Sequence, residues 1–194
     1  MDKDLSNYRK SYSKEQLIES NIGDNPMELF QKWFYEVDAN FEIDETNAMT
    51  LSTMGLDGYP KNRVVLLKGK AMDRNPNVCI SFFWHAAERQ IIIKGKAEKI
   101  AENLSDGYFE SRPRGSQLGA VVSKQSEIIA NRDYLEDKLS ALELQYQGKE
   151  IPRPVFWGGY IVKPVEFEFW QGRPNRLHDR IRFLLQEDYS WKID

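Results

Sequence analysis

The sequence predicts a mostly antiparallel β-barrel with attached helices, an α+β fold. After one N-terminal helix, strand-like runs bounded by turn residues follow, and two further helical stretches are inserted late among them. The chain has 194 residues, of which 41% are hydrophobic, so it is long enough to bury a full core. We therefore expect one domain over residues 25–194, preceded by a flexible N-terminal arm or lid over residues 1–24.

The first regular element expected along the chain is a helix. Asn25 is a preferred capping residue, and Pro26 suits the first turn because the N–H that it lacks would be unpaired there anyway. Apolar side chains then recur at helical spacing, which predicts one face packed on the core. These side chains are Phe30, Trp33, Phe34 and Val37.

A hairpin and several further strands follow this helix. Asp57 and Gly58 form a tight turn of the kind that joins two antiparallel strands. Pro164 is expected to bend the last strand-like run into two segments, because proline lacks the N–H that a central strand needs. The expected strands cover residues 48–53 and 62–68 on either side of the turn, then 78–83, 90–97 and 159–170.

Two helices are expected between the strands. The first runs from about residue 102 to residue 111, and the second covers residues 132–146 before Gly148, a typical helix stop. The second helix carries an apolar stripe at helical spacing. The stripe consists of Leu135, Leu139, Leu142 and Tyr146.

The composition excludes several classes of protein. A formal net charge of -3 argues against a general nucleic-acid binding surface. Cys79 is the only cysteine, so we expect neither an internal disulfide nor a metal site. No apolar stretch approaches the roughly 20 residues that span a bilayer, and the polar start lacks the apolar region of a signal peptide. A cytoplasmic enzyme or binding protein fits best.

Three nitrogen-rich side chains alternate near the C-terminus. Arg176, His178 and Arg180 occupy every second position, and alternate side chains of an extended strand share one face. Such a face suits an anion or a phosphorylated ligand, and the preceding Trp170 and Gly172 are typical of a pocket rim. A solvated, charged edge strand explains the same alternation. Both interpretations stay open on this segment alone.

Two further segments could hold phosphate. Arg63 and Lys68 bracket an apolar strand, and two cations so placed suit two phosphates, although cations at strand ends also occur without a ligand. Tyr108 lies on the expected helix that ends near Arg112 and Ser116, where proline and glycine free backbone N–H groups. This second segment predicts a cradle for a small phosphate group.

Neutral side chains could complete such a site. Gln90, Gln125 and Ser126 could hydrogen-bond the edge of a heteroaromatic ring, or equally complete the ends of helices and strands. The glycine-rich motifs that bind nucleotides and the nucleophile elbow are missing. Nicotinamide and nucleoside triphosphate chemistry are therefore disfavoured.

Taken in order, these segments resemble the pyridoxamine 5'-phosphate oxidases, the flavin enzymes of vitamin B6 metabolism. The resemblance covers nearly the whole chain. It implies an FMN-binding split barrel, a homodimer with FMN at the subunit interface, and oxidation of pyridoxamine or pyridoxine 5'-phosphate to pyridoxal 5'-phosphate by O2. The matching segments include residues 47–49, 63–68, 75–76, 88–90, 111–116, 123–126, 156–159, 169–172 and 176–180.

The resemblance also implies roles for single residues. Arg176 would orient the substrate and stabilise developing negative charge, while His178 would either share a proton with the reacting group or only orient the ring. The implied substrate contacts are Lys68, Tyr108, Arg112, Ser116, Arg176 and His178, with Arg9 and Tyr12 as a lid. The implied FMN contacts are Arg63, Val64, Val65, Leu66, Leu67, Lys68, Gln90, Gln125, Ser126, Trp170 and Arg180.

The chain departs from this family after Lys68. Family members continue with a turn, a strand that ends in Tyr-Thr-Asn and a Ser-x-Lys segment, whereas this sequence runs on to Asn75 and Pro76. Either the segment is deleted, which would weaken FMN binding, or residues are missing from the sequence. We favour missing residues, because loss of a barrel strand would expose backbone and core. Two rival functions stay open: a non-catalytic carrier of flavin or pyridoxal phosphate, and a flavin reductase or haem-handling split-barrel protein.

Overall fold

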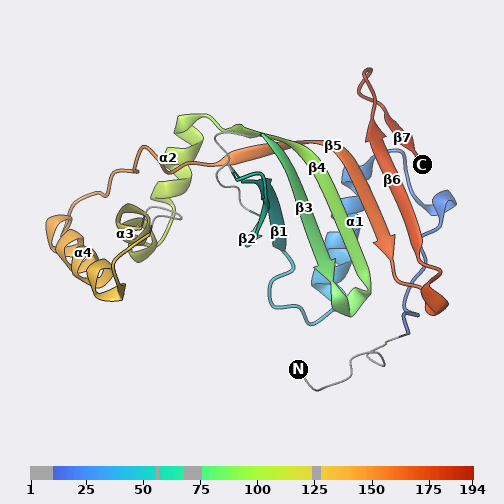
Figure 1. The fold of residues 1–194 in the computed structure, drawn as a ribbon, viewed down its shortest axis with the longest axis horizontal. Coiled ribbons are helices and arrows are strands. Elements are labelled where there is room, and N and C mark those ends of the chain that lie inside the picture. Colours follow the sequence, from blue (N-terminus) through green and yellow to red (C-terminus); the bar gives the residue numbers. More distant parts are fainter. Residues whose placement is uncertain (1–10, 56, 68–75, 124–127) are drawn as a thin grey trace. The chain divides into compact units, whose positions relative to one another are not determined.

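The structure is a computed structural model that describes residues 11–55, 57–67, 76–123 and 128–194 (Figure 1). These residues form two compact units. Unit 1 comprises the described residues up to Leu67, then 76–98 and 162–194, and unit 2 comprises those of 99–161. Each unit has its own buried core. A single domain over residues 25–194 stays a prediction.

Unit 1 is built around a seven-stranded sheet with the strand order β2-β1-β3-β4-β5-β6-β7. Every strand pair whose register is described is antiparallel. This sheet, together with the helices, confirms the predicted fold class. The strands are β1 (Ala48–Met54), β2 (Pro60–Leu66), β3 (Asn77–Trp84), β4 (Arg89–Lys99), β5 (Tyr160–Gln171), β6 (Asp179–Leu185) and β7 (Trp191–Ile193).

The predicted hairpin joins β1 and β2. Gly58 has a φ of 78°, a left-handed conformation that glycine adopts without a steric clash. The backbone N–H of Tyr59 donates to Asp57 Oδ1 at 3.2 Å, and this bond holds the pKa of the Asp57 carboxyl below its usual value. The turn sets the register in which Leu51 of β1 faces Arg63 of β2. The turn at Asp57 and Gly58 thus fixes the position of Arg63, a predicted site residue.

The predicted first helix is α1 (Pro26–Asn40), which lies across one face of the sheet (Figure 1). Its cap forms as expected, because the backbone N–H of Met27 donates to the side chain of Asn25. Trp33 packs edge-to-face on Phe169 of β5, with ring centroids 5.3 Å apart. The helix therefore closes the core of unit 1, whose fully buried aromatic side chains include Phe82, Phe167, Phe169 and Phe183.

β5 is one strand of 12 residues, whereas the sequence predicts two segments bent at Pro164. Its pairing with β6 begins only at Glu166, so Pro164 lies where no bond to that neighbour is required. Gly95 of β4 lets β5 come close, because a Cβ at this position would lie 2.5 Å from the carbonyl oxygen of Lys163. These two local features allow a continuous strand.

Unit 2 contains, among the described residues, the helices α2 (Glu102–Glu110), α3 (Arg114–Val122) and α4 (Arg132–Gln145). α2 and α4 were predicted, but α3 was not, because Gly115 and Gly119 lower its helix propensity. Burial of Leu118 stabilises α3 through tertiary packing instead. The core of unit 2 consists of Phe109, Leu118, Ile151 and Trp157.

Short elements complete the described fold. Three-residue 3-10 helices cover Glu19–Asn21, His85–Ala87 and Pro174–Arg176. Gly148, the predicted stop after α4, has a left-handed φ of 69°. No helix in the described part of the chain is long and apolar enough to cross a membrane.

Candidate functional site

Three aromatic rings from distant parts of the chain meet in unit 1, and we call Tyr12, Trp170 and His178 the aromatic corner. The ring centroids of Trp170 and His178 lie 4.8 Å apart, and the Tyr12 ring lies 5.8 Å from each of them. Trp170 belongs to β5, His178 precedes β6, and Tyr12 belongs to the N-terminal segment. The structure thus brings three of the predicted site residues together.

The imidazole of His178 is held by a backbone hydrogen bond. The N–H of Arg173 donates to His178 Nδ1 at 3.0 Å. A ring nitrogen that accepts a hydrogen bond carries no proton, so the neutral imidazole has its proton on Nε2. His178 can therefore donate from Nε2, while a second proton on Nδ1 would break the bond to Arg173.

Arg176, His178 and Arg180 do not share one face of an extended strand, so that prediction is wrong. Pro174 starts a short 3-10 helix, and Asn175 and Arg176 both have left-handed backbone angles, with φ of 58° and 62°. β6 begins only after His178. The cause is local, because proline fixes φ and asparagine tolerates the left-handed region, so the chain turns before the strand starts. Arg176 is exposed at this turn.

Arg180 lies in β6, directly opposite Trp170 of β5. Its Nε lies 3.6 Å from Glu168 Oε1, and 62% of the Arg180 side chain is exposed. An ion pair of this length and exposure contributes little to stability. Arg180 therefore keeps most of its capacity to bind an anion next to the aromatic corner.

β2 and β4 carry the remaining described FMN candidates. Arg63 is half-buried, and its side chain forms no hydrogen bond or ion pair with another described residue. It begins the predicted run through Val64, Val65, Leu66 and Leu67, in which Val64 is 76% exposed. Gln90 Nε2 donates to Ser81 Oγ at 3.2 Å, which orients its amide. Arg9, Lys68, Gln125 and Ser126, and the join after Lys68, lie outside the described residues.

In unit 2, Tyr108 and Arg112 gather around Trp157. Tyr108 stacks on Trp157 with ring centroids 5.9 Å apart, and the guanidinium carbon of Arg112 lies 5.1 Å from the Trp157 ring centroid. Arg112 Nη1 is buried without a hydrogen-bond partner among the described residues. A buried donor without an acceptor destabilises the fold, so this nitrogen is suited to bind an anion. Ser116 lies half-buried in the first turn of α3, just after Arg112.

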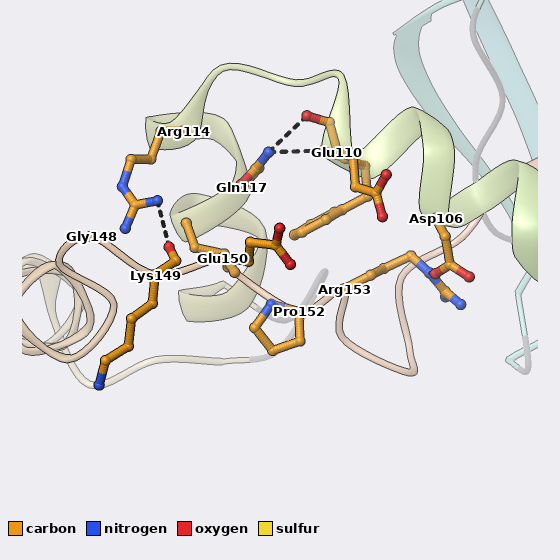
Figure 2. Close-up of a pocket in the computed structure, with 11 residues that line it drawn as sticks. Asp106, Glu110, Arg114, Gln117, Gly148, Lys149, Glu150, Pro152 and Arg153 are labelled. Atoms are coloured by element: carbon orange, nitrogen blue, oxygen red, sulfur yellow. Dashed lines mark hydrogen bonds and ion pairs between the residues drawn. The ribbon is translucent and has the colours of Figure 1, made fainter.

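Gln117 holds the loop that carries Arg112, although the sequence did not single it out. Its Nε2 lies 3.2, 3.1 and 3.0 Å from the carbonyl oxygens of Phe109, Glu110 and Arg112. Figure 2 shows this side chain reaching from α3 back to the end of α2. A glutamine near the start of a helix has no distinctive sequence pattern, so only the contacts reveal its function in positioning the loop.

A cavity of about 850 Å³ lies in unit 2 (Figure 2). None of the predicted site residues that the structure describes lines it. Its arginines are already paired: Arg114 donates to the carbonyl oxygens of Lys149 and Tyr146, and Arg153 forms an ion pair with Asp106 at 2.5 Å. The cavity therefore differs from the Arg112 loop, where a buried donor lacks an acceptor.

Two carboxylates bind the N-terminal segment within unit 1, and neither is among the predicted site residues. Glu88 Oε2 accepts the backbone N–H groups of Ser13 at 2.8 Å and Lys14 at 3.1 Å. Asp179 Oδ2 accepts the N–H of Leu17 at 3.0 Å. The partners lie at least 74 positions apart in the sequence, so no local pattern indicates these contacts.

Comparison with known proteins shows two family matches. Residues 66–146 match the family described as pyridoxamine 5'-phosphate oxidase, and residues 157–194 match the pyridoxine 5'-phosphate oxidase C-terminal dimerisation region. The chain is 62% identical over 209 residues to a pyridoxine/pyridoxamine 5'-phosphate oxidase of Flavobacterium psychrophilum, with 99% of this chain and 98% of that protein covered. It is 44% identical over 210 residues to one of a Nostoc species, with 100% and 98% covered.

Both aligned lengths exceed the 194 residues of this chain, so these relatives contain residues that have no counterpart here. This agrees with the departure noted after Lys68. The alignments nevertheless cover almost the whole of each protein, so the difference is internal.

Two solved structures share the fold. PhzG from Burkholderia lata, in complex with tetrahydrophenazine-1-carboxylic acid, superposes with a TM-score of 0.78 at 24% identity, covering 90% of this chain and 93% of that one. A pyridoxamine 5'-phosphate oxidase-related, FMN binding protein of Nostoc punctiforme gives a TM-score of 0.62 at 13% identity, covering 89% and 98%. At these identities the likeness concerns the fold, and it confirms the predicted split-barrel class.

Proposed function

Because the chain belongs to the pyridoxine/pyridoxamine 5'-phosphate oxidase family, we propose that it oxidises pyridoxamine 5'-phosphate and pyridoxine 5'-phosphate to pyridoxal 5'-phosphate. It is an enzyme of this family, with FMN as its cofactor and O2 as the electron acceptor. The observation that carries the proposal is the buried Arg112 Nη1, which has no protein acceptor among the described residues.

The substrate phosphate is the anion that we assign to Arg112. A phosphate oxygen would satisfy the buried Nη1 through a charge-assisted hydrogen bond. Tyr108 and Ser116 would add hydroxyl donors, and α3 begins beside them, so the partial positive charge of its N-terminus would favour the same group. Lys68 would supply a further cation. Stacking on Trp157 already orients Tyr108 and Arg112 before any ligand binds.

FMN is proposed to bind to residues of unit 1 and to the segment around Gln125 and Ser126. Arg63 lacks a partner among the described residues and Arg180 has only a weak one, so both fit an anionic or electron-rich group. When bound, FMN accepts the electrons of the substrate and passes them to O2. The other proposed contacts are Val64, Val65, Leu66, Leu67, Lys68, Gln90 and Trp170.

Arg176 and His178 are proposed to act on the substrate ring. Arg176 is a fixed, exposed cation that can orient the substrate and stabilise negative charge but cannot serve as a base. His178 would donate from Nε2 to a substrate oxygen, and the bond from Arg173 to Nδ1 favours orientation over exchange of a proton. Arg9 and Tyr12 would cover the bound ring and exclude water.

We propose a homodimer as the active form, located in the cytoplasm. The match of residues 157–194 to a C-terminal dimerisation region supports this assembly. Val64 of β2 and Phe83 of β3 are 76% and 54% exposed, which leaves apolar surface on the sheet for a partner. Sedimentation of the FMN-loaded protein is expected to give twice the chain mass of 22.7 kDa. A flavin-loaded monomer would contradict the proposal.

An absorption spectrum and an oxygen-uptake assay test the activity. We expect a yellow protein that consumes O2 with pyridoxamine 5'-phosphate and much less with pyridoxamine, which lacks the phosphate assigned to Arg112. A colourless protein that binds pyridoxal 5'-phosphate would support the carrier function instead. A yellow protein that turns over neither phosphorylated substrate would count against the oxidase.

A further inference from the structure

Glu88 is a buried glutamate with an unfavourable backbone conformation. It follows the 3-10 helix His85–Ala87, is only 2% exposed and has a left-handed φ of 57°. Its N–H donates to the carbonyl oxygen of His85 at 3.2 Å, and its own carbonyl oxygen accepts the N–H of Gly172 at 2.8 Å. The backbone on both sides of Glu88 is thus fixed, and the direction of its side chain is fixed with it.

The Glu88 carboxylate bonds the backbone of the N-terminal segment. Oε2 accepts the N–H groups of Ser13 and Lys14, and hydrogen bonds to an ionised acceptor are stronger than those to a neutral one. The residue just before them is Tyr12, whose ring lies against Trp170 and His178. The position of Tyr12 in the aromatic corner therefore depends on the bonds that Glu88 makes.

Gly172 completes this contact. A Cβ on Gly172 would lie 2.8 Å from Tyr12 Cγ and 3.2 Å from Glu88 Cβ, so only glycine leaves room for the ring here. Further along the segment, Leu17 is held independently, because its N–H donates to Asp179. Gly172 thus packs against one side of the Tyr12 ring, and Glu88 binds the backbone of the two residues that follow Tyr12.

We propose that Glu88 is a positioning residue that fixes Tyr12 against Trp170 and His178 and thereby sets the affinity for the phosphorylated substrate. The inference rests on the proposed function, because Tyr12 is taken to cover the bound substrate there. Glu88 contacts the segment and not the reacting atoms. Its loss should therefore weaken substrate binding more than it slows the chemical step.

Glu88→Gln tests this proposal, because it keeps the size of the side chain and removes its charge. We expect the KM for pyridoxamine 5'-phosphate to rise roughly 5- to 20-fold, with kcat within about twofold and FMN content unchanged. Hydrogen exchange at the Ser13 and Lys14 amides should accelerate, and this readout does not require turnover. Glu15→Gln, the same change at an exposed position of the segment, is the matched control and should alter none of these values.

A double-mutant cycle with Tyr12→Ala separates positioning from general stabilisation. If Glu88 acts through Tyr12, adding Glu88→Gln to Tyr12→Ala should change KM by less than about twofold. Additive effects, an unchanged KM in Glu88→Gln alone, or loss of FMN together with the KM change would overturn the proposal. A wild-type protein without turnover would overturn the proposed function instead, and the exchange rates would then decide whether Glu88 holds the segment.

Discussion

The two groups of predicted site residues are held in different ways. In unit 2, Arg112 is held by Gln117, which is five positions away in the sequence, and Tyr108 lies on the adjoining helix. In unit 1, the aromatic corner is closed by contacts between residues 74 to 162 positions apart, through Glu88 and Asp179. The unit 2 group combines this contact along the chain with packing on Trp157 of the same unit, whereas the unit 1 group requires the folded sheet and the N-terminal segment together.

This difference predicts different responses to mutation. Helical segments with local contacts form cooperatively with their unit, so the Arg112 loop should be ready for the phosphate before any ligand arrives. The aromatic corner includes a terminal segment, and terminal segments open at lower cost than core strands. We therefore assign phosphate affinity to the unit 2 group, and orientation of the reacting ring to the unit 1 group.

The largest effect is expected for Arg176→Leu. Removing the cation that we propose stabilises developing charge should lower kcat roughly 100- to 1,000-fold, while the Kd of FMN changes little. Steady-state kinetics and a flavin titration measure the two quantities. Arg182→Leu, a change at an arginine of β6 that pairs with Asp194, is the control and should retain turnover. Normal turnover in Arg176→Leu would remove this residue from the site.

A smaller effect is expected for Arg112→Leu. This substitution should change the KM for the substrate and leave kcat nearly unchanged. A hydrogen bond to a charged group contributes about 1.5–3 kcal/mol, which corresponds to a roughly 10- to 150-fold rise in KM for pyridoxamine 5'-phosphate. The kcat/KM for pyridoxamine, which has no phosphate, should stay nearly constant and is the internal control. An equal loss of kcat/KM with both substrates would show that Arg112 does not bind the phosphate.

The smallest effect is expected for Gln117→Leu, which removes the bonds to the loop but leaves Arg112 in place. Loss of one to two net hydrogen bonds, about 1–2 kcal/mol, should lower Tm by roughly 2–8 °C for a chain of this size. The KM for the phosphorylated substrate should rise only a few-fold. A thermal melt measures the change in Tm, and steady-state kinetics with pyridoxamine 5'-phosphate measure the change in KM. A variant as stable as wild type would contradict the positioning by Gln117.

The sequence could predict the parts of this molecule that depend on neighbouring residues. Asn25 and Pro26 predict the start of α1, and Asp57 with Gly58 predicts the β1–β2 hairpin, because caps and turns are local structures. The alternation at Arg176, His178 and Arg180 does not form a strand face, because Pro174 and Asn175 turn the chain before β6 starts. In this segment the local turn residues outweigh the period-two pattern.

Other features could not be predicted locally. α3 forms because Leu118 is buried in unit 2, against the propensity of its two glycines. Glu88 and Asp179 reach the N-terminal segment across most of the chain, so only the fold brings these groups together. The resemblance to a known family supplied the candidate residues that spacing alone left open, but it assigned no role to Glu88 or Gln117.

The position of β2 at one end of the strand order bears on how Arg63 can be studied. An edge strand offers unpaired N–H and C=O groups to other chains, and Val64 and Leu67 add exposed apolar side chains there. Charged residues on an edge strand suppress such aggregation, and Lys61 and Arg63 are the cations of β2. We therefore expect Arg63 to limit aggregation at this edge in addition to its proposed cofactor contact. An Arg63 variant that precipitates would report on colloidal stability, and only Arg63→Lys, which keeps a positive charge at this position, separates this effect from FMN affinity.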